Sequence, residues 1–241
     1  MESKSLSIVL LAHNEIGSIK KDIDNLIDNV GKYFVESEII IVEDGSTDGT
    51  TNLLNELHKK KIIKHIHSKT KLGYTNAFIK GVKQASYEKI FFSDTGGKFD
   101  FYEFWKLNET FEKSNSDLTI GYRKLRHDSY LRRILTQFFN IFLRLLFKIK
   151  IKDGDSGFRI YRKSVLLDIL ENIKVVSKHL IAAEITIKFL FFGKKVNEVE
   201  VSYFQREGES RGIPPNKLIH IVKTTIFEKY LLKKELNKLK F

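Results

Sequence analysis

Two apolar runs of this chain each end directly in an acidic loop, and this pattern constrains the fold more than any other. The run at residues 38–42 leads into Asp44, and the run at 89–92 leads into Asp94. Continuous apolar runs of this length are typical of buried strands. Open α/β sheets bind their ligands in the crevice at the carboxyl ends of parallel strands. The two acidic strand ends therefore predict one crevice that holds a nucleotide.

The first half of the chain alternates strand-like and helix-like segments. Apolar runs predict strands at residues 7–12, 38–42, 62–67 and 89–93, and amphipathic segments predict helices at about 16–30, 49–58, 75–85 and 102–113. A further short strand is expected at 117–121. This alternation predicts a mostly parallel sheet that is covered by helices on both faces.

The second half has a different pattern. A long apolar helix is predicted at 129–147, then a Gly- and Asp-rich loop at 152–159, a helix at 178–192 and a strand at 196–201. Residues 205–215 are polar and contain Gly and Pro, which predicts a loop, and a basic helix is expected from about 216 onward. Because no repeat or low-complexity linker divides the chain, we expect a single domain.

The positive charge of the chain is concentrated in its second half. Residues 1–120 carry 16 Lys and Arg against 18 Asp and Glu, whereas residues 121–241 carry 26 against 12. This asymmetry predicts a polyanionic partner, and nucleic acid, an anionic membrane and a phosphorylated substrate all qualify. A solvated basic face is the alternative. The sequence has no cysteine, which excludes disulfides and thiolate metal sites.

The sequence contains no segment typical of a signal peptide or a transmembrane helix. The N-terminus lacks a basic-then-apolar segment, and no stretch reaches the roughly 18 apolar residues needed to span a bilayer. We therefore expect a protein that is soluble or peripheral, and cytoplasmic by default.

Four segments stand out, in this order: residues 8–15 (IVLLAHNE), 41–50 (IVEDGSTDGT), the acidic loop at Asp94 with 104–107 (FWKL), and 153–159 (DGDSGFR) together with 206–210 (REGES). In this order they resemble glycosyltransferase family 2, and specifically its polyprenyl-phosphate (dolichyl-phosphate) mannose or glucose synthases. The resemblance extends to about residue 211. It implies a GT-A-type α/β fold, with residues 1–121 binding the nucleotide sugar and 122–212 forming the acceptor and lid half. Residues 213–241 are expected to form a basic amphipathic C-terminal helix.

The resemblance implies an inverting transfer of a hexose from a GDP- or UDP-sugar to a membrane polyprenyl (dolichyl) phosphate, by a cytoplasmic protein that is peripheral on the inner face of the membrane. A family 2 enzyme acting on a polysaccharide or another lipid is one alternative, and a catalytically inactive homologue that serves as a partner subunit is another. The expected partners are the nucleotide-sugar donor, the polyprenyl phosphate acceptor, an anionic membrane surface and a membrane protein. Nucleic acid is not expected, because the sequence has no recognition helix and no RNA-binding aromatic motif.

Residues of the matching segments are expected to hold the donor. Glu15 and Asp44 offer carboxylates to ribose hydroxyls and a base edge, and Gly45 permits the tight turn before a helix whose N-terminal amides favour anions. An ordinary turn and helix cap is the alternative for the segment around Asp44. The residues expected to bind the nucleotide sugar are Ala12, Asn14, Glu15, Glu43, Asp44, Gly45, Ser46, Gly73, Asp94, Thr95 and Arg206.

The acidic loop departs from the family pattern at its metal site. The family usually has Asp-x-Asp there, and the second Asp helps to hold Mg²⁺ or Mn²⁺ against the diphosphate. Here the matching positions are Asp94 and Gly96, and Lys98 follows two residues later. Hard divalent cations prefer several oxygen ligands, so Asp94 alone is a weak metal site and the need for Mg²⁺ or Mn²⁺ is in doubt.

Three hypotheses follow from this change in the loop. In the first, the Lys98 ammonium replaces the cation at the leaving diphosphate. In the second, a metal still binds through Asp94, diphosphate oxygens and water. In the third, activity has been lost. The appearance of Lys98 beside a lost carboxylate favours the first hypothesis.

The predicted helix at 129–147 is the candidate acceptor site. Arg132, Thr136 and Asn140 recur every four residues and so share one polar face of an otherwise apolar helix. This pattern suits a lipid phosphate at a membrane surface, and a helix buried on all sides is the alternative. The residues expected to bind the acceptor phosphate are Arg123, Arg132, Thr136, Asn140, Ser210 and Arg211.

A lipid phosphate is already an anion, so its attack needs no general base. The residues expected to take part in catalysis are Asp94, Lys98, Arg123 and Asp155. By resemblance, Asp153 and Arg159 also lie near the sugar, and Arg206 and Arg211 flank a loop that is expected to close over the donor. Glu184 matches a family carboxylate, with catalysis and architecture both open as its role.

Overall fold

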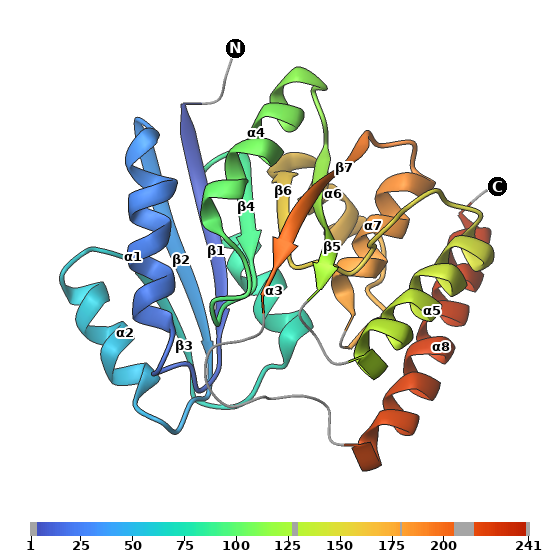
Figure 1. Cartoon of the computed structure of the whole chain (residues 1–241), viewed down its shortest axis with the longest axis horizontal. Coiled ribbons are helices and arrows are strands. Elements are labelled where there is room, and N and C mark those ends of the chain that lie inside the picture. Colours follow the sequence, from blue (N-terminus) through green and yellow to red (C-terminus); the bar gives the residue numbers. More distant parts are fainter. Residues whose placement is uncertain (1–3, 127–129, 179, 205–214, 240–241) are drawn as a thin grey trace.

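A seven-stranded sheet with helices on both faces forms the centre of the computed structural model (Figure 1). The structure describes residues 4–126, 130–178, 180–204 and 215–239, with the backbone alone for 124–126, 130–133 and 215–222. The strands are β1 (Ser5–Ala12), β2 (Glu36–Asp44), β3 (Lys64–Ser68), β4 (Lys89–Ser93), β5 (Leu118–Arg126), β6 (Phe158–Arg162) and β7 (Val196–Tyr203). The helices are α1 (Ile19–Asn29), α2 (Thr50–Lys59), α3 (Tyr74–Lys83), α4 (Phe104–Lys113), α5 (Tyr130–Phe147), α6 (Lys163–Asn172), α7 (Ile181–Phe191) and α8 (Pro215–Lys238), with short 3₁₀ turns η1 (Gly31–Tyr33) and η2 (Phe101–Glu103).

The strand order is β3-β2-β1-β4-β6-β5-β7. Within the described residues, β6 is antiparallel to its neighbours β4 and β5, and the remaining strand pairs are parallel. The carboxyl ends of β1, β2, β4 and β5 therefore meet the amino end of β6 at one edge of the sheet. The prediction of a mostly parallel α/β sheet is confirmed.

Two apolar layers hold the helices against the sheet. On one face, α1, α2 and α4 pack on the strands, with Ile23, Leu54 and Leu107 among their buried residues. On the other face, α3, α6 and α7 pack on the strands, with Phe78 and Leu166 among theirs. Burying each such side chain stabilises the fold by roughly 1.5–3 kcal/mol. Because both faces are covered, β1 and β4 are almost continuously apolar, as the sequence shows.

A third and smaller cluster joins α8 to the fold. Leu143 of α5, Ile187 of α7 and Leu232 of α8 are buried together, and Figure 1 shows α5 and α8 side by side at one end of the sheet. Phe138 and Leu145 of α5 are 67% and 75% exposed, so α5 is not buried on all sides. No helix in the described part of the chain is long and apolar enough to cross a membrane.

The sequence pattern misses β6 and α6. It predicts a loop at 152–159 and nothing between that loop and residue 178, whereas β6 is a strand of five residues that buries Phe158, Ile160 and Tyr161 in the sheet. The other expected strands and helices are present with shifted ends; for example, α1 spans Ile19–Asn29, where the pattern predicts 16–30. The loop expected at 205–215 lies almost wholly outside the described residues.

Candidate active site

The turn after β1 and the loop after β2 are hydrogen-bonded to each other at the carboxyl edge of the sheet. Asn14 adopts a left-handed conformation (φ 55°), and its Oδ1 accepts the backbone N–H of Thr47 at 2.6 Å. The N–H of Asn14 donates to Oγ of Ser46 at 2.8 Å, and the N–H of Glu15 donates to Oγ1 of Thr50 at 2.8 Å. The first two matching segments therefore form one structural unit.

Asp44 orders the loop before α3. Its Oδ1 accepts the backbone N–H of Leu72, and its Oδ2 accepts that of Gly73 at 3.0 Å. Gly73 has a φ of 80°, a conformation that favours glycine. Each carboxylate oxygen can accept a second hydrogen bond, so this role leaves acceptor capacity for the expected contact with the donor.

The other residues expected to bind the donor from this side lie around the same turn. Ala12 is the last residue of β1 and is buried, and Gly45 follows β2 with a φ of 69°. Glu43 is fully buried in β2, and its Oε1 accepts the N–H of Ser46. Glu15 is 5% exposed. These residues lie at the carboxyl edge of the sheet, and three of them, Ala12, Glu15 and Glu43, are buried.

Asp94 follows β4 directly and packs on the loop before β6. Its backbone N–H donates to the carbonyl of Gly157 at 2.9 Å, and a Cβ added to Gly157 would lie 2.5 Å from Cγ of Asp94. Oδ1 of Asp94 accepts the hydroxyl of Tyr74 at 3.1 Å, and Nζ of Lys98 lies 3.5 Å from its Oδ2. The acidic loop and the 153–159 segment thus meet at Asp94.

The sequence analysis does not single out Asp22 of α1, yet this residue holds the acidic loop. Its Oδ2 accepts the N–H of Gly96 at 2.7 Å, and its Oδ1 accepts that of Gly97 at 3.2 Å. Both glycines have positive φ angles, 93° and 65°. The available signal was a carboxylate in the buried stripe of an amphipathic helix, where Asp22 is only 2% exposed.

The described residues do not fit a Mg²⁺ or Mn²⁺ site at Asp94. Gly96 supplies no carboxylate, and the ammonium of Lys98 beside Asp94 opposes a second cation there. Thr95 donates its hydroxyl to the carbonyl of Leu11 at 3.0 Å. Among the described residues, the group of three ligand-type side chains is Glu43, His65 and His67, on β2 and β3.

Arg123 and Asp153 form a two-point ion pair near the end of β5. Nε of Arg123 lies 2.6 Å from Oδ2 of Asp153, and Nη2 lies 2.8 Å from Oδ1. Both side chains are nearly buried, at 9% and 6% exposure. Burial lowers the pKa of Arg123, but the charge of Asp153 and its hydrogen bonds outweigh this and raise the pKa. Arg123 is therefore a fixed cation.

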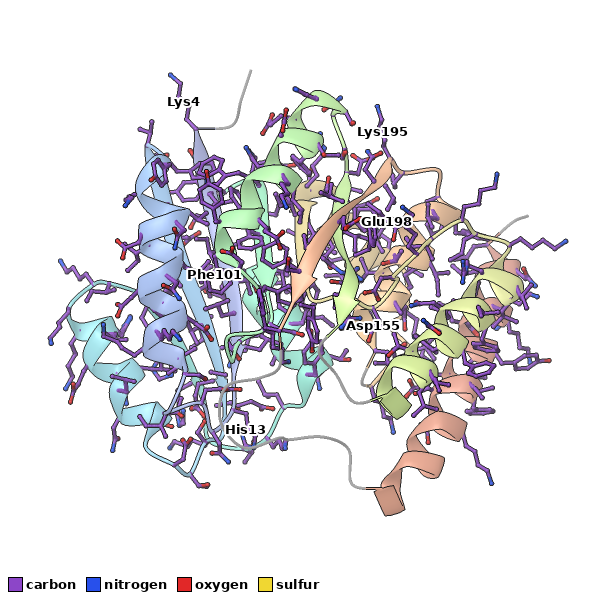
Figure 2. All side chains as sticks on the ribbon, viewed as in Figure 1. Lys4, His13, Phe101, Asp155, Lys195 and Glu198 are labelled. Atoms are coloured by element: carbon purple, nitrogen blue, oxygen red, sulfur yellow. The ribbon has the colours of Figure 1, made fainter. Side chains whose placement is uncertain are left out.

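Asp94 and the Arg123–Asp153 pair act electrostatically on two further groups, Tyr74 and Asp155. Burial raises the pKa of Asp155 to about 6, although Arg123 and Arg159 act in the opposite direction. Burial also raises the pKa of Tyr74, and the charges of Asp94 and Asp155 add to this effect. Figure 2 shows Asp155 and His13 in the half of the molecule where the strands β1 and β5 end. Tyr74 is a further site residue that the sequence analysis left out.

Three other polar residues hold loops near this site: Arg159 and Asn140 contact the loop before β6, and Glu184 contacts the segment before α7. Arg159 is fully buried and donates to the carbonyl of Gly154 at 2.6 Å, among other partners. Oδ1 of Asn140, which is 6% exposed, accepts the N–H of Gly154 at 3.3 Å. Glu184 is fully buried in an ion pair with Lys188 at 2.6 Å. These contacts give Arg159, Asn140 and Glu184 architectural roles.

The remaining expected residues are described only in part. Thr136 lies half-buried on α5, and Arg132 is described by its backbone alone, on the same helix. Arg206, Ser210 and Arg211 lie outside the described residues.

The chain is similar to known glycosyltransferases. The model of Glycosyl transferase family 2 matches residues 7–170. An undecaprenyl-phosphate mannosyltransferase of Micrococcus luteus is 25% identical over 217 residues, which cover 84% of this chain and 85% of the relative. An uncharacterised protein of Methanocaldococcus jannaschii is 27% identical over 230 residues, 90% of this chain and 96% of the relative.

Solved structures show the same fold. Glucosyl-3-phosphoglycerate synthase from Mycobacterium tuberculosis, in complex with Mn²⁺, UDP and phosphoglyceric acid, matches with a TM-score of 0.71 at 16% identity, over 95% of this chain and 78% of that chain. This agrees with the expected GT-A-type fold. Because the family model covers more than half of the sequence, including the segments that meet at Asp94, the chain belongs to glycosyl transferase family 2 and is a glycosyltransferase that uses a nucleotide-sugar donor.

Proposed function

We propose that the protein transfers a hexose, with inversion, from a GDP- or UDP-sugar to a membrane polyprenyl phosphate. The observation that carries the proposal is the 3.5 Å contact between Lys98 and Asp94, which puts an ammonium group in the loop where the family handles the donor diphosphate. The similarity to an undecaprenyl-phosphate mannosyltransferase supports the choice of acceptor.

In this proposal, an oxygen of the acceptor phosphate attacks the anomeric carbon of the sugar. The bond from that carbon to the β-phosphate oxygen breaks, and the nucleoside diphosphate leaves with the electron pair. Lys98 neutralises the charge that develops on the leaving group. Asp94 holds the ammonium at Oδ2, and the hydroxyl of Tyr74 fixes the orientation of the same carboxylate through Oδ1.

Arg123 is the cation proposed for the acceptor phosphate. Its ion pair with Asp153 keeps the guanidinium charged and fixes its plane, which suits recognition of a phosphate. A phosphate monoester is anionic at neutral pH, so positioning and charge neutralisation replace a general base. Thr136 and Arg132 of α5 are the proposed further contacts, and Asn140 of the same helix joins α5 to the loop before β6 through the N–H of Gly154.

The surface of α5 and α8 supports a membrane-bound acceptor. Phe138, Ile141 and Leu145 follow the helical spacing of one face of α5, and all three are exposed. On α8, Phe227 and Tyr230 are 60% and 62% exposed. Exposed apolar stripes beside lysine and arginine side chains suit the interface of an anionic bilayer. We propose that this surface rests on the membrane and brings the lipid phosphate to Arg123.

The test is a transfer assay with labelled GDP-mannose, UDP-glucose and UDP-GlcNAc in the presence of liposomes that contain undecaprenyl phosphate. We expect label from one donor to enter the organic phase. The matched acceptor control is undecaprenol, which lacks the phosphate and is expected to remain unlabelled. Label on an oligosaccharide or on 3-phosphoglycerate instead would contradict the lipid acceptor, and binding of a donor without any transfer would favour an inactive partner subunit.

A further inference from the structure

A second group of chemically reactive side chains lies on β2 and on the edge strand β3. His65 and His67 are two residues apart on β3 and therefore lie on the same face of the sheet. Glu43 of β2 is the direct register partner of His67. One ligand atom from each of the three side chains lies within 4.8 Å of the other two.

Glu43 provides a buried negative charge to this group. Its side chain has no exposed surface, and its Oε2 lies 2.5 Å from Nδ1 of His67. Burial raises the pKa of Glu43, but hydrogen bonds from Ser46, His67 and Thr51 together outweigh burial and lower it. Glu43 is therefore ionised. Its Oε2 contacts His67 on β3, and its Oε1 accepts the N–H of Ser46 in the loop after β2.

His65 provides a nitrogen that has no partner in the fold. Its Nδ1 lies 3.0 Å from Oδ1 of Asn55 on α2, and an amide oxygen only accepts, so Nδ1 carries the proton. The lone pair is then on Nε2, which is buried and has no hydrogen-bond partner. Burial also lowers the pKa of His65, which keeps the ring neutral. Metal-binding histidines have this arrangement, with the other ring N–H donated to an oxygen.

We propose that Glu43, His65 and His67 form a binding site for Zn²⁺ or a similar transition-metal ion. Two imidazoles and one carboxylate suit Zn²⁺, whereas Mg²⁺ and Mn²⁺ prefer sites made of oxygen ligands. The ion takes the place of the proton between Glu43 and His67, which requires Oε2 and Nδ1 to separate to roughly 3.3 Å in a tetrahedral shell. The side chain of His67 is 39% exposed and has room for this movement.

Glu43 is also among the residues expected to bind the donor, but the His65 and His67 ligands lie on β3, away from Asp94, and the metal site does not rest on the proposed transfer reaction. The site links β3 to β2 through side chains. β3 is an edge strand of the sheet, and in the described part of the chain β2 is the one strand that pairs with it. Because Oε1 of Glu43 accepts the N–H of Ser46, the ion also restrains the loop that begins at Gly45. The inferred role is therefore structural: a bound ion stabilises β3 and the first donor-binding loop.

The test uses the untagged full-length chain and two metals. Zn²⁺ binding is measured by calorimetry after treatment with EDTA and dialysis, and Co²⁺ is added to a second sample to record its visible absorption. We expect a site with a stoichiometry of about one ion per chain, a Co²⁺ spectrum typical of low coordination, and a rise in the melting temperature with Zn²⁺ but not with Mg²⁺.

The variants His65→Gln and His67→Gln are expected to abolish the Co²⁺ spectrum and the Zn²⁺-dependent rise in melting temperature. Asn55→Ala, which removes the partner of Nδ1, is expected to weaken Zn²⁺ binding by about 10- to 100-fold. His13→Gln is the matched control, because His13 lies outside the group, and it is expected to bind as the unchanged chain does. Circular dichroism of each variant checks its folding. Failure of the folded chain to bind Zn²⁺, or equal binding by the folded His65→Gln and His67→Gln variants, would overturn the proposal.

Discussion

Nζ of Lys98 lies 3.5 Å from Oδ2 of Asp94, in a loop where Gly96 stands at the position of the second family carboxylate. The side chains of Lys98 and Asp94 are 22% and 19% exposed, so the pair is only partly screened by water. The ammonium of Lys98 places N–H donors and a positive charge close to the expected diphosphate, and Asp94 holds it in position. This relationship is the physical basis for the proposal that a lysine replaces the usual cation.

Replacement of Asp22 by Ala is expected to destabilise the protein and the acidic loop together. The change leaves the N–H groups of Gly96 and Gly97 without their buried acceptor, at a cost of about 1–3 kcal/mol in the free energy of unfolding. Urea denaturation measures this cost. Asp24→Ala is the matched control on the same helix, because Asp24 pairs with Lys20 at the surface, where an i,i+4 pair contributes about 0.3–0.5 kcal/mol. Equal losses in the two variants would show that Asp22 does not hold the loop.

Replacement of Gly157 by Ala is expected to abolish donor binding. The new Cβ would lie 2.5 Å from Oδ1 of Asp94 and must displace the carboxylate that faces Lys98. Overpacking of this kind typically costs 1–3 kcal/mol, so a folded variant with a misplaced Asp94 is expected. Calorimetry with the nucleotide sugar measures the binding. Gly17→Ala serves as the control, because a Cβ at Gly17 meets no atom within 4 Å, and it is expected to bind the donor normally.

The ion pair of Arg123 and Asp153 gives a prediction that separates stability from activity. Asp153→Ala leaves a buried guanidinium unpaired and is expected to cost about 3–5 kcal/mol in the free energy of unfolding. The double variant Arg123→Met with Asp153→Leu removes both charges and is expected to recover most of this stability without recovering transfer. Chemical denaturation and the transfer assay measure the two effects. Full activity of the double variant would exclude Arg123 from the acceptor site.

Asp155 gives a prediction about pH. Its pKa in the folded protein is about 6, above the ordinary value of 3.8, so between these values the native state keeps a proton that the unfolded chain releases. The contribution of Asp155 to stability is therefore present below about pH 4 and is lost as the pH rises through about 6. Relative to the unchanged protein, Asp155→Asn is expected to gain stability over this window. Urea denaturation across the window tests this, and parallel pH profiles for the two proteins would contradict it.

The parallel part of the fold could be predicted from the sequence because its signals are local. β1, β2 and β4 contain apolar runs, the helices between them are amphipathic, and the acidic residues at the carboxyl ends of β2 and β4 reach the same edge. β6 could not be predicted in the same way. It has five residues, it follows a loop rich in Gly and Asp, and its place between β4 and β5 depends on pairing with strands that are distant in sequence.

For the candidate active site, the sequence predicts which types of residue lie there but not which atoms contact each other. The sequence pattern correctly indicates that Asp94 and Asp44 lie at strand ends, but it does not show that Asp44 orders the Leu72–Gly73 backbone. It also does not show that Asp22 holds the loop after Asp94, because that contact spans 74 residues. Periodicity can indicate that a charge lies in a buried stripe, whereas its partner is fixed only by the packing of α1 on the sheet.

The most direct test of the central claim is calorimetry of nucleotide-sugar binding in EDTA, with the unchanged protein and with Lys98→Ala. Lys106→Ala is the matched control, because Lys106 is an exposed lysine that pairs with Glu103 rather than with Asp94. The account predicts that binding of a GDP- or UDP-sugar survives EDTA and persists in Lys106→Ala. In Lys98→Ala, binding of the nucleotide sugar is expected to weaken by roughly 10- to 100-fold, because the variant loses one charge-assisted hydrogen bond to the diphosphate. Binding that requires Mg²⁺ or Mn²⁺ and is insensitive to Lys98→Ala would contradict the account.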